Sequence, residues 1–487
     1  MAHRTSADQD SVDKEKTAHI EYASSSDDQC QFTPKEDKKI RQRIDWRLIP
    51  ALGLMYGVSL MDRKNVSNAY IAGMRADLSL RVAYRYSLIT LVFFITYTLF
   101  QPPMTVLCRK IGPRIFLPGI CLAWGVVIIG FGFSRNWTTL VGLRLVLGLL
   151  EAGYFPGCII SANFETYTRY EVARRYSCFY LIGSLASALS GILAYGLMQM
   201  EGVSGIRGWR WIFIMEGVIT CTFAMIGYVF LIRFPDQEME EPSFKFLTVQ
   251  EATYVVGKIN KDRGDAEAAA FHLGRFLKPA KDIEIWGFAL IFLCTTTVTY
   301  GFSFFLPIIL RENLGYSVAA SQCLVAPPYV LAAILMYGMS WIGDKYRTRA
   351  PIIIVNAIVS VVGLAILGFA KNPGVQYFGI FIGVAGCNAN IPGTMAYQAN
   401  NIRGQWRRAF CSASLTGFGG IGGIAGSLIF RSQDAPGYVP GIIGTIVANV
   451  IIIITAVLLT LLFRARNAKA DRGELVIEEL EEFRYTI

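Results

Sequence analysis

The stretch "GLRLVLGLLEAGYFPG", from Gly142 to Gly157, decides the fold. Its leucines, valines and glycines are typical of a helix in lipid, yet it carries Arg144 and Glu151. At 3.6 residues per turn, the two side chains return to nearly the same helix face, about 10 Å apart along the axis. Ionisable groups at that depth cost several kcal/mol unless they face a cavity or a partner. The stretch therefore predicts a membrane helix with a polar face.

Apolar runs of similar length recur along the 487 residues, of which 53% are hydrophobic and only 17% charged. Soluble proteins carry about a quarter charged residues, and a helix needs about 20 apolar residues to cross a bilayer. Because the runs are continuous rather than alternating, a β-barrel is excluded. We predict an all-α polytopic membrane protein with twelve transmembrane helices. The predicted spans are 46–62, 86–107, 115–133, 138–162, 176–199, 211–232, 284–306, 322–342, 350–369, 375–399, 410–430 and 438–463.

A polar stretch after the sixth span divides the chain into two six-helix halves. Features of the first half recur in the second at a common offset, such as "YFPG" at 154–157 and "NIPG" at 390–393. Repeated halves predict a binding site near the bilayer midplane, exposed alternately to each side. The expected segments are a disordered cytoplasmic tail (1–44), the first half (45–232), a central cytoplasmic loop (233–283), the second half (284–463) and a cytoplasmic C-terminal tail (464–487).

The net charge of +10 could indicate nucleic-acid binding, but its placement argues otherwise. Most of the 46 lysines and arginines fall on the side of the N-terminus, so the positive-inside rule places both chain ends in the cytoplasm. Ten cysteines form no CxxC pair or Cys/His cluster, so no metal site, cofactor or disulfide framework is expected. We expect a monomer in the lipid bilayer of the plasma membrane, with the vacuole as an alternative.

Two ionisable clusters are the candidate functional residues. Arginine stays charged and suits a carboxylate, so Arg144 is predicted to attract an anionic substrate. Glu151 can accept a proton and is predicted to couple transport to protons. "LMDRKNVSNA" at 60–69 adds Asp62, a second protonatable group, and Arg63, provided that the first helix runs beyond its apolar edge. The alternative is a structural polar network that fixes helix register.

Uncharged side chains within the spans are further candidates to line a substrate cavity. They are Tyr56, Tyr97, Tyr300, Phe304, Asn388 and Asn390. Two basic loops, "CRKIGPR" at 108–114 and "GDKYRTR" at 343–349, occupy corresponding places in the halves. The predicted gating residues in these loops are Arg109, Arg114, Asp344, Arg347 and Arg349.

These motifs resemble the major facilitator superfamily and, more narrowly, its anion:cation symporter family. "RLVLGLLEAGYFPG" resembles that family's fourth-helix signature, "DRKNVSNA" its first-helix segment and "NNIRGQWRRAF" the segment after its tenth helix. The resemblance implies proton coupling through Asp62 and Glu151, and arginines that handle anions at Arg63 and Arg144. Its fungal branch takes up allantoate, nicotinate or pantothenate. One departure is Arg109, which stands where the superfamily loop carries an acidic residue.

The sequence thus predicts a secondary transporter for proton-coupled symport of a small organic anion, such as a vitamin or ureide monocarboxylate. A proton-coupled exporter of a metabolite or drug is the nearest alternative, although the fifth span lacks the Gly-Pro motif common in such proteins. A nutrient receptor that binds without transporting is a second alternative. An enzyme is not expected, because no nucleophile–base pair or cofactor motif is evident.

Overall fold

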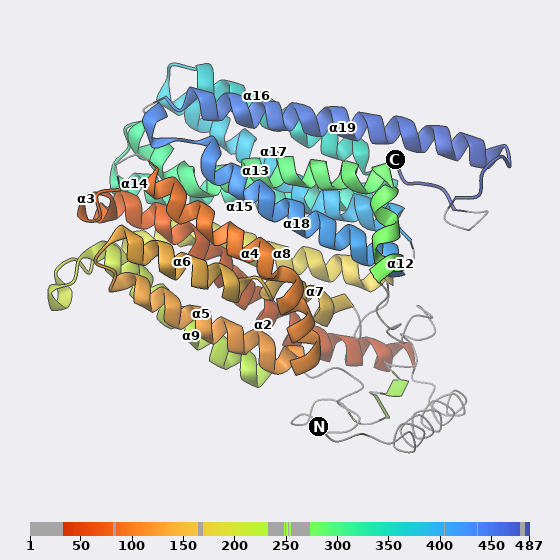
Figure 1. Ribbon diagram of the computed structural model, residues 1–487, viewed down its shortest axis with the longest axis horizontal. Coiled ribbons are helices and arrows are strands. Elements are labelled where there is room, and N and C mark those ends of the chain that lie inside the picture. The colour runs from red at the N-terminus through yellow and green to blue at the C-terminus, as the bar shows by residue number, and fades with distance from the viewer. Residues whose placement is uncertain are drawn as a thin grey trace.

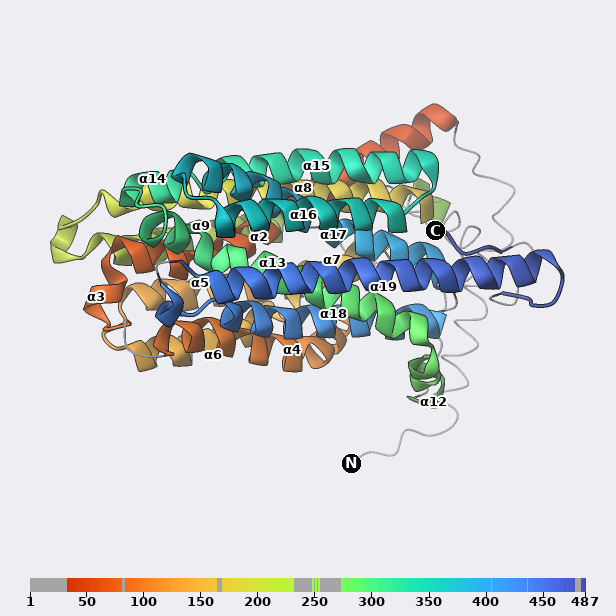
Figure 2. The same ribbon diagram turned by 90° about the horizontal axis from the view of Figure 1, so that it is seen from above.

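The computed structural model is a bundle of long helices that run along one axis (Figure 1). The residues described are 33–80, 84–163, 169–231, 248, 250–251, 253–254, 273–403, 405–435, 437–477 and 483–487. The helices of the first half, red to yellow, lie beside those of the second half, green to blue. Figure 2 shows that α3 and α14 lie at one end of the bundle, opposite the C-terminus. We call these the α3–α14 end and the tail end.

The helices follow the predicted order of spans. The first half contains α2 (Pro34–Ala69), η2 (Tyr70–Met74), α3 (Arg75–Asp77), α4 (Arg85–Ile111), α5 (Pro113–Gly132), α6 (Trp137–Glu151), α7 (Tyr154–Asn163), α8 (Arg169–Met198), η3 (Val203–Gly205) and α9 (Gly208–Phe230). The second half contains α12 (Leu273–Leu277), η4 (Lys278–Lys281), α13 (Ile283–Glu312), α14 (Val318–Cys323), α15 (Ala326–Tyr346), α16 (Ala350–Phe369), α17 (Pro373–Asn401), α18 (Gln405–Ile429), η5 (Ser432–Asp434) and α19 (Val439–Asp471).

Within the described residues, 10 helices are long and apolar enough to cross a membrane. The two other long helices that complete the twelve are α2, which carries charged residues in its interior, and α17, which carries amides. Polar side chains inside these helices lower their hydropathy without shortening them. The predicted all-α, twelve-helix fold class is confirmed.

The first helix is longer than its apolar stretch. α2 begins at Pro34, within the segment predicted as a disordered tail, and continues to Ala69. Proline suits the first helical position, and Glu36 accepts a hydrogen bond of 2.9 Å from the Thr33 backbone N–H. The predicted tail at 1–32 and most of the predicted loop at 233–283 lie outside the described residues. Because α2 passes Asp62, the charged "DRK" lies inside the bundle rather than at a helix end.

Glycines on α18 bring the two halves together. α4 packs against α18, and α8 packs against α15. A Cβ added at Gly420 would lie 1.9 Å from Thr98 Oγ1, and one at Gly423 would lie 2.3 Å from the Phe94 ring. These contacts cross from α18 to α4. "GIGGIAG" at 420–426 is therefore a packing surface, where small residues allow close approach of helices.

The hydrogen-bond pattern of the fourth span is interrupted beside Glu151, although the span as a whole continues from Trp137 to Cys158. α6 ends at Glu151, a turn follows at Ala152 and Gly153, and α7 starts at Tyr154. Pro156 has no N–H to donate to the carbonyl one turn earlier, so a continuous helix would lose a hydrogen bond there. The acidic side chain thus stands at the end of a helix segment in the bundle interior.

Candidate functional site

A cavity lies between the halves and is lined by side chains of α2, α4, α7, α8, α13, α15, α17 and α18. The empty space between these side chains, together with the open solvent that adjoins it, has a volume of about 1010 Å³. Its only charged lining residues within the described part of the chain are Arg63 and Lys64, and both are cationic. A cavity at the interface of two helical halves is the expected place for a transported substrate.

The cavity brings together five of the eight residues predicted to bind substrate. These five are Tyr56, Arg63, Tyr97, Tyr300 and Asn388. The other three, Arg144, Phe304 and Asn390, are buried but do not belong to the lining. The structure also places neither predicted proton-coupling carboxylate, Asp62 or Glu151, on the cavity surface. Adjacent residues of α2 therefore face different surroundings, because successive side chains of a helix point about 100° apart.

Arg63 lies in the cavity wall and is already paired. Its Nε donates to Glu151 Oε2 over 3.0 Å, and Ser59 donates to the same oxygen over 2.8 Å. Its Nη1 donates to the Tyr300 hydroxyl over 2.9 Å, which links α2 to α13 in the other half. The Tyr97 ring lies 4.8 Å away, within cation–π range. Arg63 thus connects the fourth span to both sides of the cavity.

Lys64 is the cavity cation without a carboxylate partner among the described residues. Its Nζ donates to the Ser187 carbonyl over 3.3 Å and lies 3.3 Å from the centroid of the Tyr329 ring. The side chain is only 5% exposed. Lys64 belongs to the first-helix cluster "LMDRKNVSNA", but no role was predicted for it from the sequence. The sequence signal was a third ionisable residue beside Asp62 and Arg63, because an ionisable group within a membrane helix indicates a functional site.

Arg144 is buried away from the cavity that it was predicted to line. It is 1% exposed, its guanidinium lies 5.8 Å from the Phe93 ring and 5.5 Å from the Phe131 ring, and its Nε has no hydrogen-bond partner among the described residues. It interacts electrostatically with Glu151 and Asp62 without touching the cavity. Direct contact with a substrate in the described state is therefore not available to Arg144, and its predicted role in anion handling stays a prediction.

Asp62 lies in a separate acidic cluster between α2 and α9. Thr220 Oγ1 donates to Asp62 Oδ2 over a long 3.4 Å, and Asn65 donates to Glu216 in a short hydrogen bond. Glu216, 2% exposed, was missed by sequence reasoning. Its signal was an acidic residue inside the apolar run "WIFIMEGVITC" of the sixth span. The rule that drew attention to Arg144 applies equally to Glu216.

Two other predicted lining residues have structural contacts instead. The Phe304 carbonyl accepts from the Tyr86 hydroxyl over 2.8 Å, and Asn390 Nδ2 lies 3.3 Å from the Ile353 carbonyl on α16. Their side chains are 0% exposed. Their roles in substrate binding are not supported by a place on the cavity surface. Asn388, two residues before Asn390, faces the cavity instead.

Polar contacts between the halves gather at the α3–α14 end. Arg75 pairs with Glu312, which also accepts from the Tyr438 hydroxyl over 2.7 Å. Gln322 donates to the Asn68 carbonyl over 3.3 Å. These contacts lie beyond Arg63 as seen from the tail end and join the two halves there.

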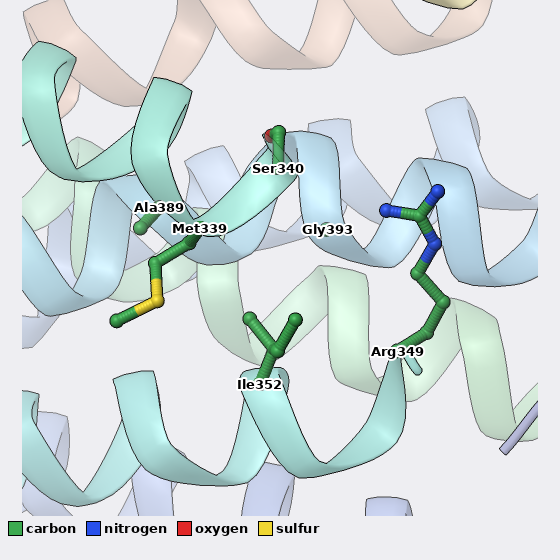
Figure 3. A pocket seen from close by; sticks show the side chains of 6 residues that line it. All are labelled: Met339, Ser340, Arg349, Ile352, Ala389 and Gly393. Carbon is green, nitrogen blue, oxygen red and sulfur yellow. The ribbon is translucent and has the colours of Figure 1, made fainter. Parts of the chain in front are cut away.

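The predicted gating loops lie at the tail end. Asp344 pairs with Arg349, and the backbone N–H of Arg349 donates to the Ile487 carbonyl over 2.9 Å. Figure 3 shows the Arg349 side chain reaching from the start of α16 toward Gly393 on α17, in a small pocket that both residues line. Arg347 is exposed, Arg114 is half-buried, and the side chain of Arg109 lies outside the described residues. The gating roles stay predictions.

Comparison with known proteins agrees with this architecture. Residues 52–427 match the Major Facilitator Superfamily. The MFS-type transporter cnsO of Penicillium expansum is 32% identical over 92% of this chain and 88% of its own length. The high-affinity nicotinic acid transporter of Saccharomyces cerevisiae is 27% identical over 92% of this chain and 81% of its own.

Solved structures show the same fold. A bacterial homolog of the human lysosomal transporter Spinster, in an inward-facing and occupied conformation, aligns with a TM-score of 0.62 at 14% identity, covering 85% of this chain and 96% of that chain. Its unoccupied inward-facing form gives a TM-score of 0.63 at 15% identity, with the same coverage. The relatives are transporters and not enzymes. This multi-pass membrane chain, with its interfacial cavity between two helical halves, belongs to the Major Facilitator Superfamily.

Proposed function

We propose that this transporter carries a small organic monoanion together with protons by alternating access. The observation that carries the proposal is Lys64, a buried cation on the cavity surface with no carboxylate partner among the described residues. A buried charge without a partner is costly, so a substrate carboxylate would supply what Lys64 lacks. Arg63 beside it is already neutralised by Glu151. One available cation favours a monocarboxylate over a dicarboxylate.

The rest of the lining favours a substrate with a flat apolar part. Aromatic rings line the cavity on both halves: Tyr56, Tyr97, Phe155, Phe292, Tyr300 and Tyr329. Aromatic side chains stack on planar groups, while a few polar groups fix orientation. The yeast relative named for nicotinic acid supports this class, since nicotinate is a planar aromatic monocarboxylate. The resemblance to the fungal branch of the anion:cation symporters is consistent with it.

The orientation is part of the proposal. The positive-inside distribution favours a cytoplasmic tail end, with the α3–α14 end facing outward. In this proposal, the contacts between the halves at the α3–α14 end close the cavity to the outside, and the cavity faces the cytoplasm. In the opposite state, the loops with Arg114, Asp344, Arg347 and Arg349 would close the tail end. We propose the plasma membrane as the location and a monomer as the working unit.

Proton coupling is proposed to run through the buried carboxyl groups near the cavity. Glu151 is bound to Arg63, and Asp62 lies one residue before Arg63 on α2. A substrate carboxylate that draws the Arg63 guanidinium away would leave Glu151 without its main partner. Protonation of a carboxylate would then remove the charge that opposes closure of the cavity around the substrate.

Uptake by the purified protein in liposomes tests the proposal. Labelled nicotinate, benzoate, pantothenate and allantoate are supplied outside while the lumen is held alkaline. We expect at least one of them to accumulate inside, and a protonophore to abolish its accumulation. Accumulation that ignores the protonophore contradicts proton coupling, and absence of flux for all four contradicts the organic-anion class. Gradient-driven movement only in the reverse direction, tested with acidic lumen, would support an exporter instead.

A further inference from the structure

The acidic cluster between α2 and α9 does not line the cavity, and no hydrogen bond joins its carboxyl groups to Arg63 among the described residues. Asp62 and Asn65 are three residues apart on α2, while Glu216 and Thr220 are four residues apart on α9, so each pair shares one helix face. Asn65 Nδ2 donates to Glu216 Oε2, and Thr220 Oγ1 contacts both Asp62 Oδ2 at 3.4 Å and the Glu216 carbonyl at 2.9 Å. The two carboxyl groups therefore belong to one polar cluster between α2 and α9, close enough to repel each other electrostatically.

This polar cluster contains more hydrogen-bond acceptors than hydrogen-bond donors. Asp62 Oδ1, Asn65 Oδ1 and Glu216 Oε1 have no hydrogen-bond partner among the described residues. The three side chains are 3%, 0% and 2% exposed, so bulk water does not satisfy them. A buried acceptor without a donor costs about 1–3 kcal/mol, and more when it is charged. A proton on one carboxyl group turns it from an acceptor into a donor toward its neighbours.

The charged groups around Asp62 do not neutralise it by contact. Glu216 and Glu151 repel the Asp62 carboxylate, while Arg144 attracts it without a hydrogen bond between them. The thiols of Cys121 and Cys221 also face Asp62. Glu151, in contrast, accepts directly from Arg63 and Ser59. Of the buried acids in this half, Asp62 and Glu216 are thus the least compensated by cations.

The buried charges in the interior of the first half also sum to zero when all of these groups are ionised. The six ionisable side chains concerned are each at least nine-tenths buried: Asp62, Arg63, Lys64, Arg144, Glu151 and Glu216. Three are cations and three are acids, so with all six ionised their charges cancel. A bound monoanion adds one negative charge to this low-dielectric region, and one bound proton restores neutrality.

We propose that Asp62 and Glu216 form a proton-holding carboxyl pair that takes up one proton with each monocarboxylate bound beside Lys64. The proton forms an O–H bond on one of the two carboxyl groups, where it removes the repulsion between them, and it leaves when the anion leaves. Two adjacent carboxyl groups that share a proton titrate as one unit. The inference rests on the proposed function and adds to it a site, Glu216, and a stoichiometry of one proton per anion.

The first test measures binding of the best-transported member of the nicotinate, benzoate, pantothenate and allantoate panel to the purified, full-length protein at several pH values. With one linked proton, the dissociation constant of the wild type should rise about tenfold per pH unit on the alkaline side. Glu216→Gln replaces the carboxyl group with an amide of nearly the same shape that does not titrate. The dissociation constant of this variant for the anion should therefore lose the pH dependence. Glu474→Gln, an exposed site in the C-terminal segment, is the matched control and should keep the wild-type slope.

The second test locates the proton with variants that keep the charge. Binding of the same anion should produce the infrared carbonyl stretch of a protonated carboxyl group in the difference spectrum. Glu216→Asp should shift this band, because the shortened side chain changes the hydrogen bond with Asn65 and the separation from Asp62. Glu284→Asp, at a buried carboxylate held by Arg407 and Arg466 in the other half, should leave it unchanged.

The outcomes separate this inference from the proposed function. A Glu216→Gln protein with the full tenfold slope, or a band that Glu216→Asp does not move, overturns the carboxyl pair while leaving proton-coupled anion transport intact. A wild type that binds an anion with no pH dependence contradicts proton coupling itself. A wild type that binds none of the four anions contradicts the proposed substrate class and the pair together.

Discussion

The guanidinium of Arg63 on α2 and the carboxylate of Glu151 on α6 form a buried ion pair. The Arg63 Nε and Nη2 lie 3.0 and 2.9 Å from Glu151 Oε2, and the two side chains are 5% and 0% exposed. The pair joins α2, which lines the cavity, to the C-terminal end of α6 in the fourth span. It holds Glu151 against the cavity wall and leaves Lys64 as the cation open to a ligand.

The ion pair predicts a non-additive effect on stability. Arg63→Met alone leaves Glu151 buried without its main partner, which costs about 3–5 kcal/mol in comparable pairs. The double variant Arg63→Met/Glu151→Met removes both charges, so the apparent Tm in detergent should recover part of that loss. Arg472→Met, in an exposed pair with Glu474, should change the Tm little. A double variant no more stable than the single one would contradict this account.

Lys64 should set the affinity for the anion. A hydrogen bond to a charged group contributes about 1.5–3 kcal/mol, so Lys64→Gln should raise the half-saturating concentration about 10- to 100-fold. Uptake into liposomes measures this effect. Lys371→Gln, at an exposed lysine between α16 and α17, provides the control and should transport as the wild type does. Equal half-saturation for the two variants would remove Lys64 from the binding site.

Gly420 should be required for contact between the halves. Its added Cβ would lie 1.9 Å from Thr98 Oγ1, whereas a Cβ at Gly417 of the same helix meets nothing within 4 Å. Gly420→Ala should therefore lower the Tm, and Thr98→Ala should restore part of it by removing the nearest atom. Gly417→Ala should keep or raise the Tm, since alanine favours a helix by about 0.5–1 kcal/mol over glycine. Equal effects of the two glycine variants would refute the close approach.

The contacts of Glu312 should hold the α3–α14 end closed. Glu312→Ala removes the ion pair with Arg75 and the hydrogen bond from Tyr438. A partly exposed pair contributes up to about 1 kcal/mol, equivalent to about a fivefold change in population. A cysteine placed at Ser303 in the cavity should then react about fivefold faster with an impermeant thiol reagent added from the α3–α14 side. Arg472→Ala, paired only at the exposed tail, should not alter this rate; the parent without the new cysteine gives the background.

Much of the architecture could be read from the sequence because apolar length alone decides which segments enter a bilayer. The all-α class and the number of spans follow from this constraint. Hydropathy predicted too early an end for the first helix, because the charged residues Asp62, Arg63 and Lys64 are typical of the end of a membrane span. Inside the protein these three side chains contact other helices, and α2 continues to Ala69.

The identity of the cavity residues could not be read in the same way. The sequence established that ionisable groups are buried in the membrane, because their residue types and their place in apolar runs are local properties. Only tertiary structure decided that Lys64 faces the cavity, that Arg144 packs against Phe93 and Phe131, and that Asp62 lies near enough to Glu216 to be repelled by it. Each depends on which helix faces lie together, and contacts between residues far apart in the chain decide that.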